Sequence, residues 1–256
     1  MTASIPSRSG GRILVDALRL HGVDRIYCVP GESYLEVLDA LHDHPEVRLV
    51  VTKHEGAAAN MAEAEGKLTG RPGICFVTRG PGATHASIGV HIAAQDSTPM
   101  ILFVGQIATR HRGREAFQEV DYTAMFGSIA KLVAEIDHAD RIPEFVARAF
   151  QCATSGRPGP VVLSLPEDML ETACQVADTQ PWRQVQASPS PADGQALAAQ
   201  LAQAQQPLVI VGGANWSEQA RSDFAAFATA WNLPVAASFR RQDLFDNRRA
   251  QYVGHL

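Results

Sequence analysis

The sequence has 256 residues, with 22 basic and 27 acidic side chains and a formal net charge of −5. A protein that binds a nucleic-acid backbone carries a basic excess, so we expect no nucleic-acid partner. Hydrophobic residues make up 46% and charged residues 19% of the chain, which excludes a disordered protein and predicts a packed core.

Short β-branched runs alternate with longer segments of helical spacing. The short runs predict six strands: Ile26–Val29, Arg48–Val51, Ile74–Thr78, Met100–Val104, Lys131–Ile136 and Val161–Leu165. Apolar residues recur every three or four positions between them, which predicts helices at Arg12–His21, Tyr34–His42, Gly56–Leu68, Ala83–Gln95 and Pro143–Thr154. Strands this continuously apolar are covered on both faces. The predicted fold class is α/β, a six-stranded parallel sheet flanked by helices.

Composition changes after the last of these strands. Residues 173–191 are rich in Gln, Ser and Pro and lack apolar periodicity, so we interpret them as a linker. Residues 10–172 then form the first domain, and residues 192–256 form part of a second parallel α/β domain. Its predicted elements are helix Gln195–Ala204, strand Leu208–Val211, helix Glu218–Trp231 and strand Val235–Ser238. Two strands and two helices bury little apolar surface, which indicates an incomplete domain.

Neither a membrane span nor a metal centre is expected. No apolar run approaches the roughly 20 residues that cross a bilayer, and the first residues lack the apolar stretch of a secretory signal. We therefore expect a cytoplasmic protein. The four cysteines form no C-x-x-C pair and the nine histidines form no H-x-x-x-H pair. Reduced thiols are favoured over disulfides or a zinc site.

Glycines and one carboxylate stand where predicted strands end. Glu55 lies at the turn between strand Arg48–Val51 and an Ala-rich helix, Pro30-Gly31-Glu32 follows the first strand, and Thr78-Arg79-Gly80-Pro81-Gly82 follows the third. The carboxyl ends of parallel strands meet at one sheet edge, where ligands bind, and glycine lets the backbone approach a ligand closely. For Glu55 alone, a purely structural role stays open, in which the carboxylate complements the helix dipole.

Phosphate-binding signatures are absent. The segment G-P-G-A-T-H at residues 80–85 departs from G-x-G-x-x-G, and no G-x-x-x-x-G-K-[ST] occurs. Their absence disfavours an unrelated nucleotide-binding α/β domain.

Five motifs occur in order along the chain: V-P-G-E near residue 30, K-H-E-G-A-A-A-N-M-A-E-A from 53, G-I-C-F-V-T-R-G-P-G-A-T from 73, G-R-E-A-F-Q-E at 113–119 and T-S-G-R-P-G-P-V at 154–161. Together they resemble thiamine-diphosphate enzymes of the acetolactate synthase (acetohydroxyacid synthase) group, over residues 10 to 256. The resemblance implies a first domain that binds the aminopyrimidine ring of the cofactor, then a middle domain. A third domain in that family holds the diphosphate and its Mg²⁺.

The resemblance implies a catalytic role for Glu55. Hydrogen bonded to the pyrimidine ring, its carboxylate would favour the imino tautomer, whose nitrogen removes the thiazolium C2 proton before attack on a 2-keto acid. Ala57, Ala58 and Met61 are expected to give Glu55 apolar surroundings. The predicted cofactor contacts are Pro30, Gly31, Glu32, Thr78, Gly80, Pro81, Gly82 and Arg157.

Two further residues are implied by the same resemblance to contact substrate. Gln118 matches a position near the reacting centre and is a second catalytic candidate, with Phe117 as an apolar wall. From the residues alone, a loop with a buried Phe and a solvent-facing Gln stays open.

Arg157 matches a position that contacts FAD in flavin-containing members, and a plain surface arginine before a proline turn is the alternative.

The chain departs from the family in two respects. G-D-G followed by N-N, the diphosphate-binding signature, is absent, and the middle domain is expected to stop before the part that would hold most of the flavin. The expected cofactor site is therefore the pyrimidine half of a thiamine diphosphate site, with the Mg²⁺ ligands missing and FAD as a further candidate cofactor. The charged diphosphate contributes much of the binding energy, so we expect the chain alone to be inactive.

The predicted function is a thiamine-diphosphate-dependent 2-keto acid carboligase or decarboxylase, a transferase of branched-chain amino acid biosynthesis by resemblance. The expected partners are a 2-keto acid and either a second copy, as a homodimer or higher oligomer, or a chain that carries the diphosphate-binding domain. The alternative is a non-catalytic pyrimidine-domain module, or half of a split enzyme, that pairs with another chain.

Overall fold

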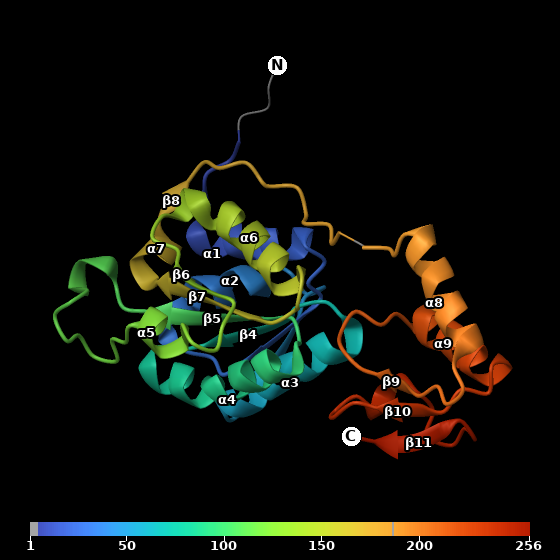
Figure 1. The fold of residues 1–256 in the computed structure, drawn as a ribbon. Coiled ribbons are helices and arrows are strands. Elements are labelled where there is room, and N and C mark those ends of the chain that lie inside the picture. The colour runs from blue at the N-terminus through green and yellow to red at the C-terminus, as the bar shows by residue number, and fades with distance from the viewer. Residues whose placement is uncertain (1–4, 186) are drawn as a thin grey trace. The chain divides into compact units, whose positions relative to one another are not determined.

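The structure is a computed structural model that describes residues 5–185 and 187–256. Contacts between residues divide the chain into two compact units, Met1–Gln184 and Val185–Leu256. Each unit is an α/β structure with its own sheet (Figure 1).

The main sheet of the first unit is parallel, with strand order β3-β2-β4-β5-β7-β6. Its strands are β2 (Arg25–Cys28), β3 (Arg48–Val51), β4 (Gly73–Val77), β5 (Met100–Gln106), β6 (Leu132–Glu135) and β7 (Pro160–Pro166). The α-helices are α1 (Gly10–Leu20), α2 (Leu35–His42), α3 (Glu55–Thr69), α4 (Gly80–Asp96), α5 (Tyr122–Phe126), α6 (Ile142–Thr154) and α7 (Glu167–Glu171). The short 3-10 helices are η1 (Glu32–Tyr34), η2 (Thr109–His111) and η3 (Ala139–Arg141). The predicted six-stranded parallel sheet is confirmed.

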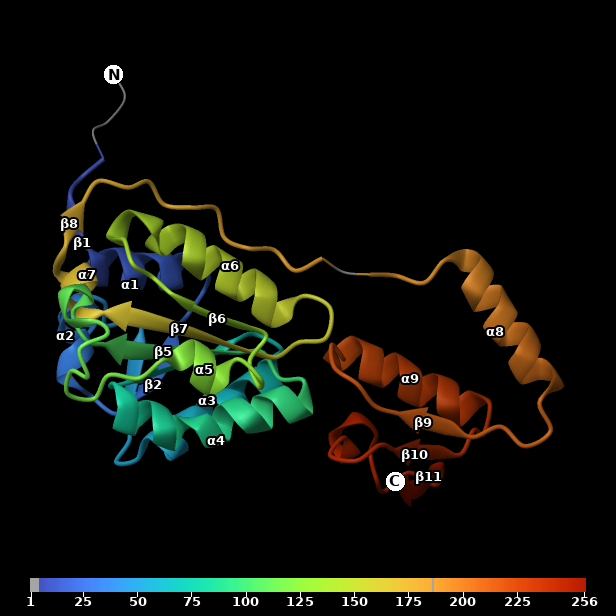
Figure 2. The same ribbon diagram turned by 60° about the vertical axis from the view of Figure 1, so that its left-hand side comes forward.

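Helices cover both faces of this sheet, as Figures 1 and 2 show. Helices α1, α2 and α6 pack on one face and α3, α4 and α5 on the other. Alternate residues of β4 enter the two cores, with Phe76 in the first and Val77 in the second. This alternation follows from the period of two along a strand, and it explains why the central strands are apolar throughout.

Helices α3 and α4 lie unusually close together. A Cβ added at Gly89 of α4 would lie 2.6 Å from the Cβ of Ala59 on α3. Small residues at the contact are therefore required for this approach. Because both helices begin at the carboxyl edge of the sheet, their close packing brings their first turns together.

The segment interpreted as a linker is partly built into the first unit. Ala173–Cys174 forms β8, which pairs antiparallel with β1 (Arg8–Ser9). Further along, Trp182 packs against the core of α1, α2 and α6 and donates from Nε1 to Thr154 Oγ1 at 3.0 Å. A two-residue strand and a single tryptophan leave no periodic pattern, so these contacts were not expected from the sequence.

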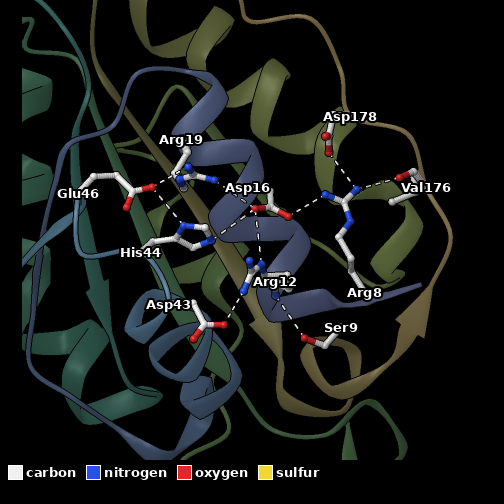
Figure 3. Close-up of polar contacts among 10 residues, drawn as sticks. All are labelled: Arg8, Ser9, Arg12, Asp16, Arg19, Asp43, His44, Glu46, Val176 and Asp178. Atoms are coloured by element: carbon white, nitrogen blue, oxygen red, sulfur yellow. Dashed lines mark hydrogen bonds and ion pairs between the residues drawn. The ribbon is translucent and has the colours of Figure 1, made fainter. Parts of the chain in front are cut away.

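An ion-pair cluster joins α1 to the strap, the name we give to β8 and the segment that follows it up to Gln184 (Figure 3). Asp16 of α1 is only 16% exposed and accepts from Arg8 Nη1 at 2.7 Å, while Arg8 also reaches Asp178 at 2.9 Å. Nitrogen atoms of three further side chains lie within 3.7 Å of the same carboxylate, namely those of Arg12, Arg19 and His44. Asp16 therefore connects α1 with Arg8 before it and with His44 after α2, and Arg8 extends the cluster to Asp178.

The second unit contains a three-stranded parallel sheet, with strand order β11-β10-β9. Its elements are α8 (Pro191–Gln203), β9 (Val209–Val211), α9 (Glu218–Ala230), β10 (Val235–Ala237), η4 (Gln242–Leu244) and β11 (Tyr252–His255). Strand β11 was not predicted, because Tyr252-Val253-Gly254-His255 is short and interrupted by glycine. Phe245 and Leu233 close the small core beneath α9.

The four cysteines are free thiols, and Cys28 and Cys75 are buried. Among the described residues, no helix is both long enough and apolar enough to cross a membrane.

Candidate functional site

The turns after β2, β3 and β4 meet at the carboxyl edge of the main sheet. A Cβ added at Gly31 would lie 2.7 Å from the Cβ of Thr78, and one added at Gly82 would lie 3.1 Å from Thr78 Cγ2. The same Cβ at Gly82 would be 3.7 Å from Cγ of Glu55. Gly31, Glu55, Thr78 and Gly82 therefore form one cluster at this edge, and glycine at positions 31 and 82 lets the turns pack closely against Thr78.

Glu55 is the first residue of α3, and its side chain is 14% exposed. Its Oε2 lies 2.8 Å from Nδ1 of His85, a residue of α4. Its other oxygen, Oε1, has no hydrogen-bond partner among the described residues. Glu55 is thus held at the helix start with one oxygen engaged and one available.

The surroundings of Glu55 differ from those expected. Ala57 and Met61 lie on the outward face of α3 and are exposed, so they do not enclose the carboxylate within this chain. Two imidazoles lie beside it instead. His54 caps α3 by accepting from Gly56 N at 3.0 Å, and its ring stacks on that of His85 with centroids 4.7 Å apart.

A buried tyrosine supports the first turn from below. Tyr34 is 1% exposed, and its hydroxyl donates to the carbonyl of Val29. Burial, with the neighbouring Cys28, raises the pKa of Tyr34, so the phenol stays a donor. Burial likewise raises the pKa of the Cys28 thiol to about 11. Cys28 is therefore a neutral packing residue and no nucleophile at neutral pH.

Arg79 links three turns of this edge. Its buried guanidinium donates to Glu32 Oε1 at 2.8 Å and to Glu167, which begins α7 after β7. Glu32, a predicted cofactor contact, therefore points its carboxylate at Arg79. Ser33 and Thr78 join the same turns through their hydroxyls, 3.0 Å apart.

The predicted substrate residues lie on a loop that reaches the same edge. Gln118 has φ +66° and accepts through its carbonyl oxygen from Gly80 N at 3.2 Å. Phe117 is 79% exposed. The alternative of a buried Phe is thus wrong, because the left-handed backbone at Gln118 turns the tip of the loop outward. Pro81 is exposed one residue beyond Gly80.

Arg157 lies apart from these residues. It donates to Ser97 Oγ at 2.7 Å and to the carbonyls of Ala94 and Gln95 at 3.0 and 3.3 Å, at the C-terminal end of α4. Helix α4 starts at the carboxyl edge and has 17 residues, so its end lies about 25 Å away. The structure therefore separates Arg157 from the Glu55 cluster.

Sequence reasoning did not select His85, Tyr34 or Arg79. His85 follows Gly82 by three residues, which is the spacing that places two positions on one helix face, so its proximity to Glu55 was readable once α3 and α4 were known to pack together. The partners of Arg79 lie 47 and 88 residues away and left no local signal.

Comparison with known proteins agrees with this geometry. Residues 8–125 match the thiamine pyrophosphate enzyme N-terminal TPP binding domain, and residues 195–256 match the central domain of thiamine pyrophosphate enzymes. The acetolactate synthase large subunit of Parasynechococcus marenigrum is 36% identical over 97% of this chain and 42% of its own length. The acetolactate synthase isozyme 3 large subunit of Escherichia coli is 35% identical over 97% of this chain and 44% of its own length.

The fold and the match over residues 8–125 define an α/β domain of the thiamine pyrophosphate enzyme N-terminal type, and the edge around Glu55 lies within it. The chain belongs to the thiamine pyrophosphate enzyme family, and within it the chain is similar to acetolactate synthase large subunits. It spans less than half the length of these relatives.

Proposed function

We propose that this chain provides the pyrimidine-binding half of a thiamine-diphosphate site in a 2-keto acid carboligase or decarboxylase of the acetolactate synthase type. The observation that carries the proposal is Glu55, held at the first residue of α3 beside Gly82 and Thr78 with Oε1 available. A carboxylate at that place can share a proton with a ring nitrogen of the pyrimidine.

The residues of this edge are of the kind that a pyrimidine ring needs. The carboxylate of Glu55 lies beside the backbone turn at Gly82, and glycine at positions 31 and 82 lets the turns after β2 and β4 pack against Thr78. When bound, the cofactor supplies an electron sink for decarboxylation of the 2-keto acid. Glu55 would hold a proton at the ring nitrogen, and the exposed Phe117 with Gln118 would meet the substrate.

The diphosphate and Mg²⁺ need residues that the sequence does not supply. G-D-G and N-N are absent from the 256 residues, and no group of three His, Cys, Asp or Glu side chains in residues 5–185 and 187–256 could hold a metal ion. We therefore propose that residues outside these 256 hold this half of the cofactor. FAD binding through Arg157 stays a separate prediction at the opposite sheet edge.

A two-fold self-association would place one subunit's Glu55 against a cofactor held by another. The outward faces of α3 and α4 support this proposal, because they combine small and apolar exposed residues: Ala57, Met61, Ala64 and Leu68 on α3, with Pro81 and Ile88 on α4. A cytoplasmic location and a role in branched-chain amino acid biosynthesis accompany this proposal by similarity alone.

The test is to co-express the chain with a domain that carries the family's G-D-G and N-N signature, a pair that we call the completed enzyme. We expect thiamine diphosphate binding and consumption of pyruvate with release of CO₂. A completed enzyme that assembles and binds the cofactor but converts no 2-keto acid contradicts the proposal. That result favours the alternative of a non-catalytic module, which the missing diphosphate signature supports.

A further inference from the structure

The loop between β5 and α5 adopts a costly backbone conformation. Three of its residues have positive φ: Gly113 at +73°, Glu115 at +54° and Gln118 at +66°. Glycine accepts this region freely, whereas a non-glycine residue such as Glu115 or Gln118 is strained there. Contacts elsewhere must therefore hold the loop in place.

One set of contacts lies inside the loop. Glu119 accepts from the backbone N–H of Gly113 at 2.6 Å and of Ala116 at 3.1 Å. These donors lower the pKa of Glu119, with a smaller contribution from Arg112, so the carboxylate stays charged at neutral pH. Glu119 thus closes the loop on itself.

A second set joins the loop to the sheet. Arg112 lies with Nε 3.7 Å from Glu119 Oε1, and its Nη1 donates to Glu135 of β6. Glu135 also accepts from Ser164 Oγ of β7 at 3.0 Å. The side chains of Arg112, Glu119 and Glu135 are each one third exposed or less, so solvent screens their charges only in part.

The far end of the loop rests on the candidate site. Gly80 N donates to the carbonyl of Gln118, and the buried Gln106 donates from Nε2 to the carbonyl of Val120 at 3.0 Å. Displacement of the loop at Arg112 would therefore move Gln118 relative to the turn at Gly80.

We propose that Arg112 is a positioning residue, which acts through Glu119 and Glu135 to fix the loop so that Gln118 and Phe117 face the substrate. Arg112 itself makes no contact with the Glu55 cluster among the described residues. The assignment of the loop to substrate rests on the proposed function, whereas the ordering of the loop by Arg112 does not.

The first experiment measures amide hydrogen exchange by NMR on the 256-residue chain. Arg112→Ala should raise the exchange rates of Gly113 and Ala116 amides about tenfold or more and leave those of β4 and β5 unchanged. Arg112→Lys should recover part of the protection, because a single ammonium pairs with one carboxylate at a time. The matched control is Arg114→Ala, in the same loop, whose side chain forms no ion pair among the described residues.

Unchanged exchange at Gly113 and Ala116 in Arg112→Ala would overturn the proposal. If Arg112→Ala fails to fold, Glu135→Gln decides instead, because its amide oxygen can still accept from Ser164 while the negative charge that pairs with Arg112 is gone. Glu135→Gln should then loosen the same two amides, and wild-type protection in this variant would equally overturn the proposal.

The second experiment uses the completed enzyme. Arg112→Ala should raise KM for pyruvate or lower turnover about tenfold or more, since misplacement of a substrate residue by about an ångström has effects of this size. Hydrogen–deuterium exchange at C2 of the bound cofactor should stay within twofold of wild type. Loss of C2 exchange together with turnover, or no change in either constant, overturns the positioning role. A wild-type completed enzyme without turnover contradicts the proposed function and leaves the amide-exchange experiment to decide on the loop.

Discussion

At the residue scale, Glu55 combines two properties that a helix-start carboxylate does not need. It lies against the backbone of Gly82, and it has a histidine partner on a different helix. A residue that only complements the helix dipole would gain a few tenths of a kcal/mol to about 1 kcal/mol from the first turn alone and would need neither neighbour. The structure therefore favours a role at the sheet edge, and substitution can separate the two roles.

Glu55→Gln should keep the shape of the side chain and remove its ability to exchange a proton. In the completed enzyme, cofactor affinity should change modestly, while C2 hydrogen–deuterium exchange and turnover should fall by about 10² or more, the scale of lost acid–base help. C2 exchange at the wild-type rate would show that Glu55 is only a helix-start residue.

Gln118→Ala should have a different effect. Its amide is proposed to contact substrate, and its backbone already holds Gly80, so truncation of the side chain leaves the turn in place. C2 exchange should be nearly that of wild type, while steady-state turnover of the 2-keto acid slows. Equal losses in both measurements would place Gln118 at the cofactor instead.

The buried groups beneath the site predict a loss of stability in alkali. The pKa of Cys28 rises from 9.0 to about 11 on folding, and those of Cys75 and Tyr34 also rise because of burial. Well below pH 9 these groups are neutral in both states, so they do not change stability with pH. As the pH rises from about 9 toward 11, the unfolded thiols ionise first, and the free energy of unfolding falls.

Urea unfolding at pH 8 and pH 10 checks this expectation. Cys28→Ala should lose less stability than wild type between the two values, although its stability at pH 8 is lower because of the cavity. An identical loss of unfolding free energy in both proteins would show that Cys28 does not contribute to the loss of stability at alkaline pH.

At the element scale, the sequence predicts those helices and strands whose burial leaves a regular pattern of apolar residues. The strands of the main sheet were readable because runs such as Met100–Val104 are buried on both faces and therefore continuously apolar. Strands β8 and β11 were not, because the first has two residues and the second contains Gly254 at φ +118°. Glu55 and the glycines follow strand ends and were readable, whereas His85 and Arg79 depend on which helices and turns meet in space.

The strap formed by β8 and the segment up to Gln184 predicts a specific stability effect. Asp16→Asn should lower the free energy of unfolding by about 1–3 kcal/mol, because Arg8, Arg12 and Arg19 would then face one another without the shared carboxylate. Urea unfolding followed by circular dichroism measures the change.

The matched control for this prediction is Asp43→Asn. Within residues 5–185 and 187–256, Asp43 pairs with Arg12 alone, and its side chain is 62% exposed, so its removal should cost about 0.5 kcal/mol or less. Equal effects of the two substitutions would mean that the cluster around Asp16 is worth no more than a surface ion pair.

At the scale of the whole molecule, the helices that cover the two faces of the main sheet expose different apolar side chains. Helix α4 exposes Ile88, and α3 exposes Met61 and Leu68, on the side of the sheet where Glu55 lies. Leu35 of α2 is exposed on the other side. Two-fold pairing through the first surface would bring a second copy toward the start of α3, where Glu55 lies.

Ile88→Lys should therefore weaken self-association, and Leu35→Lys should not. Burial of an isoleucine is worth about 1.5–3 kcal/mol, so its replacement by a charged side chain should raise the dimer dissociation constant at least tenfold. Sedimentation velocity of the 256-residue chain across a micromolar concentration range measures the constant for wild type and both variants. Because both residues are exposed aliphatic side chains on helices of the same unit, the comparison isolates the face from the general effect of an added charge. A wild-type chain that stays monomeric in this range, or equal weakening by the two substitutions, contradicts an interface on α3 and α4.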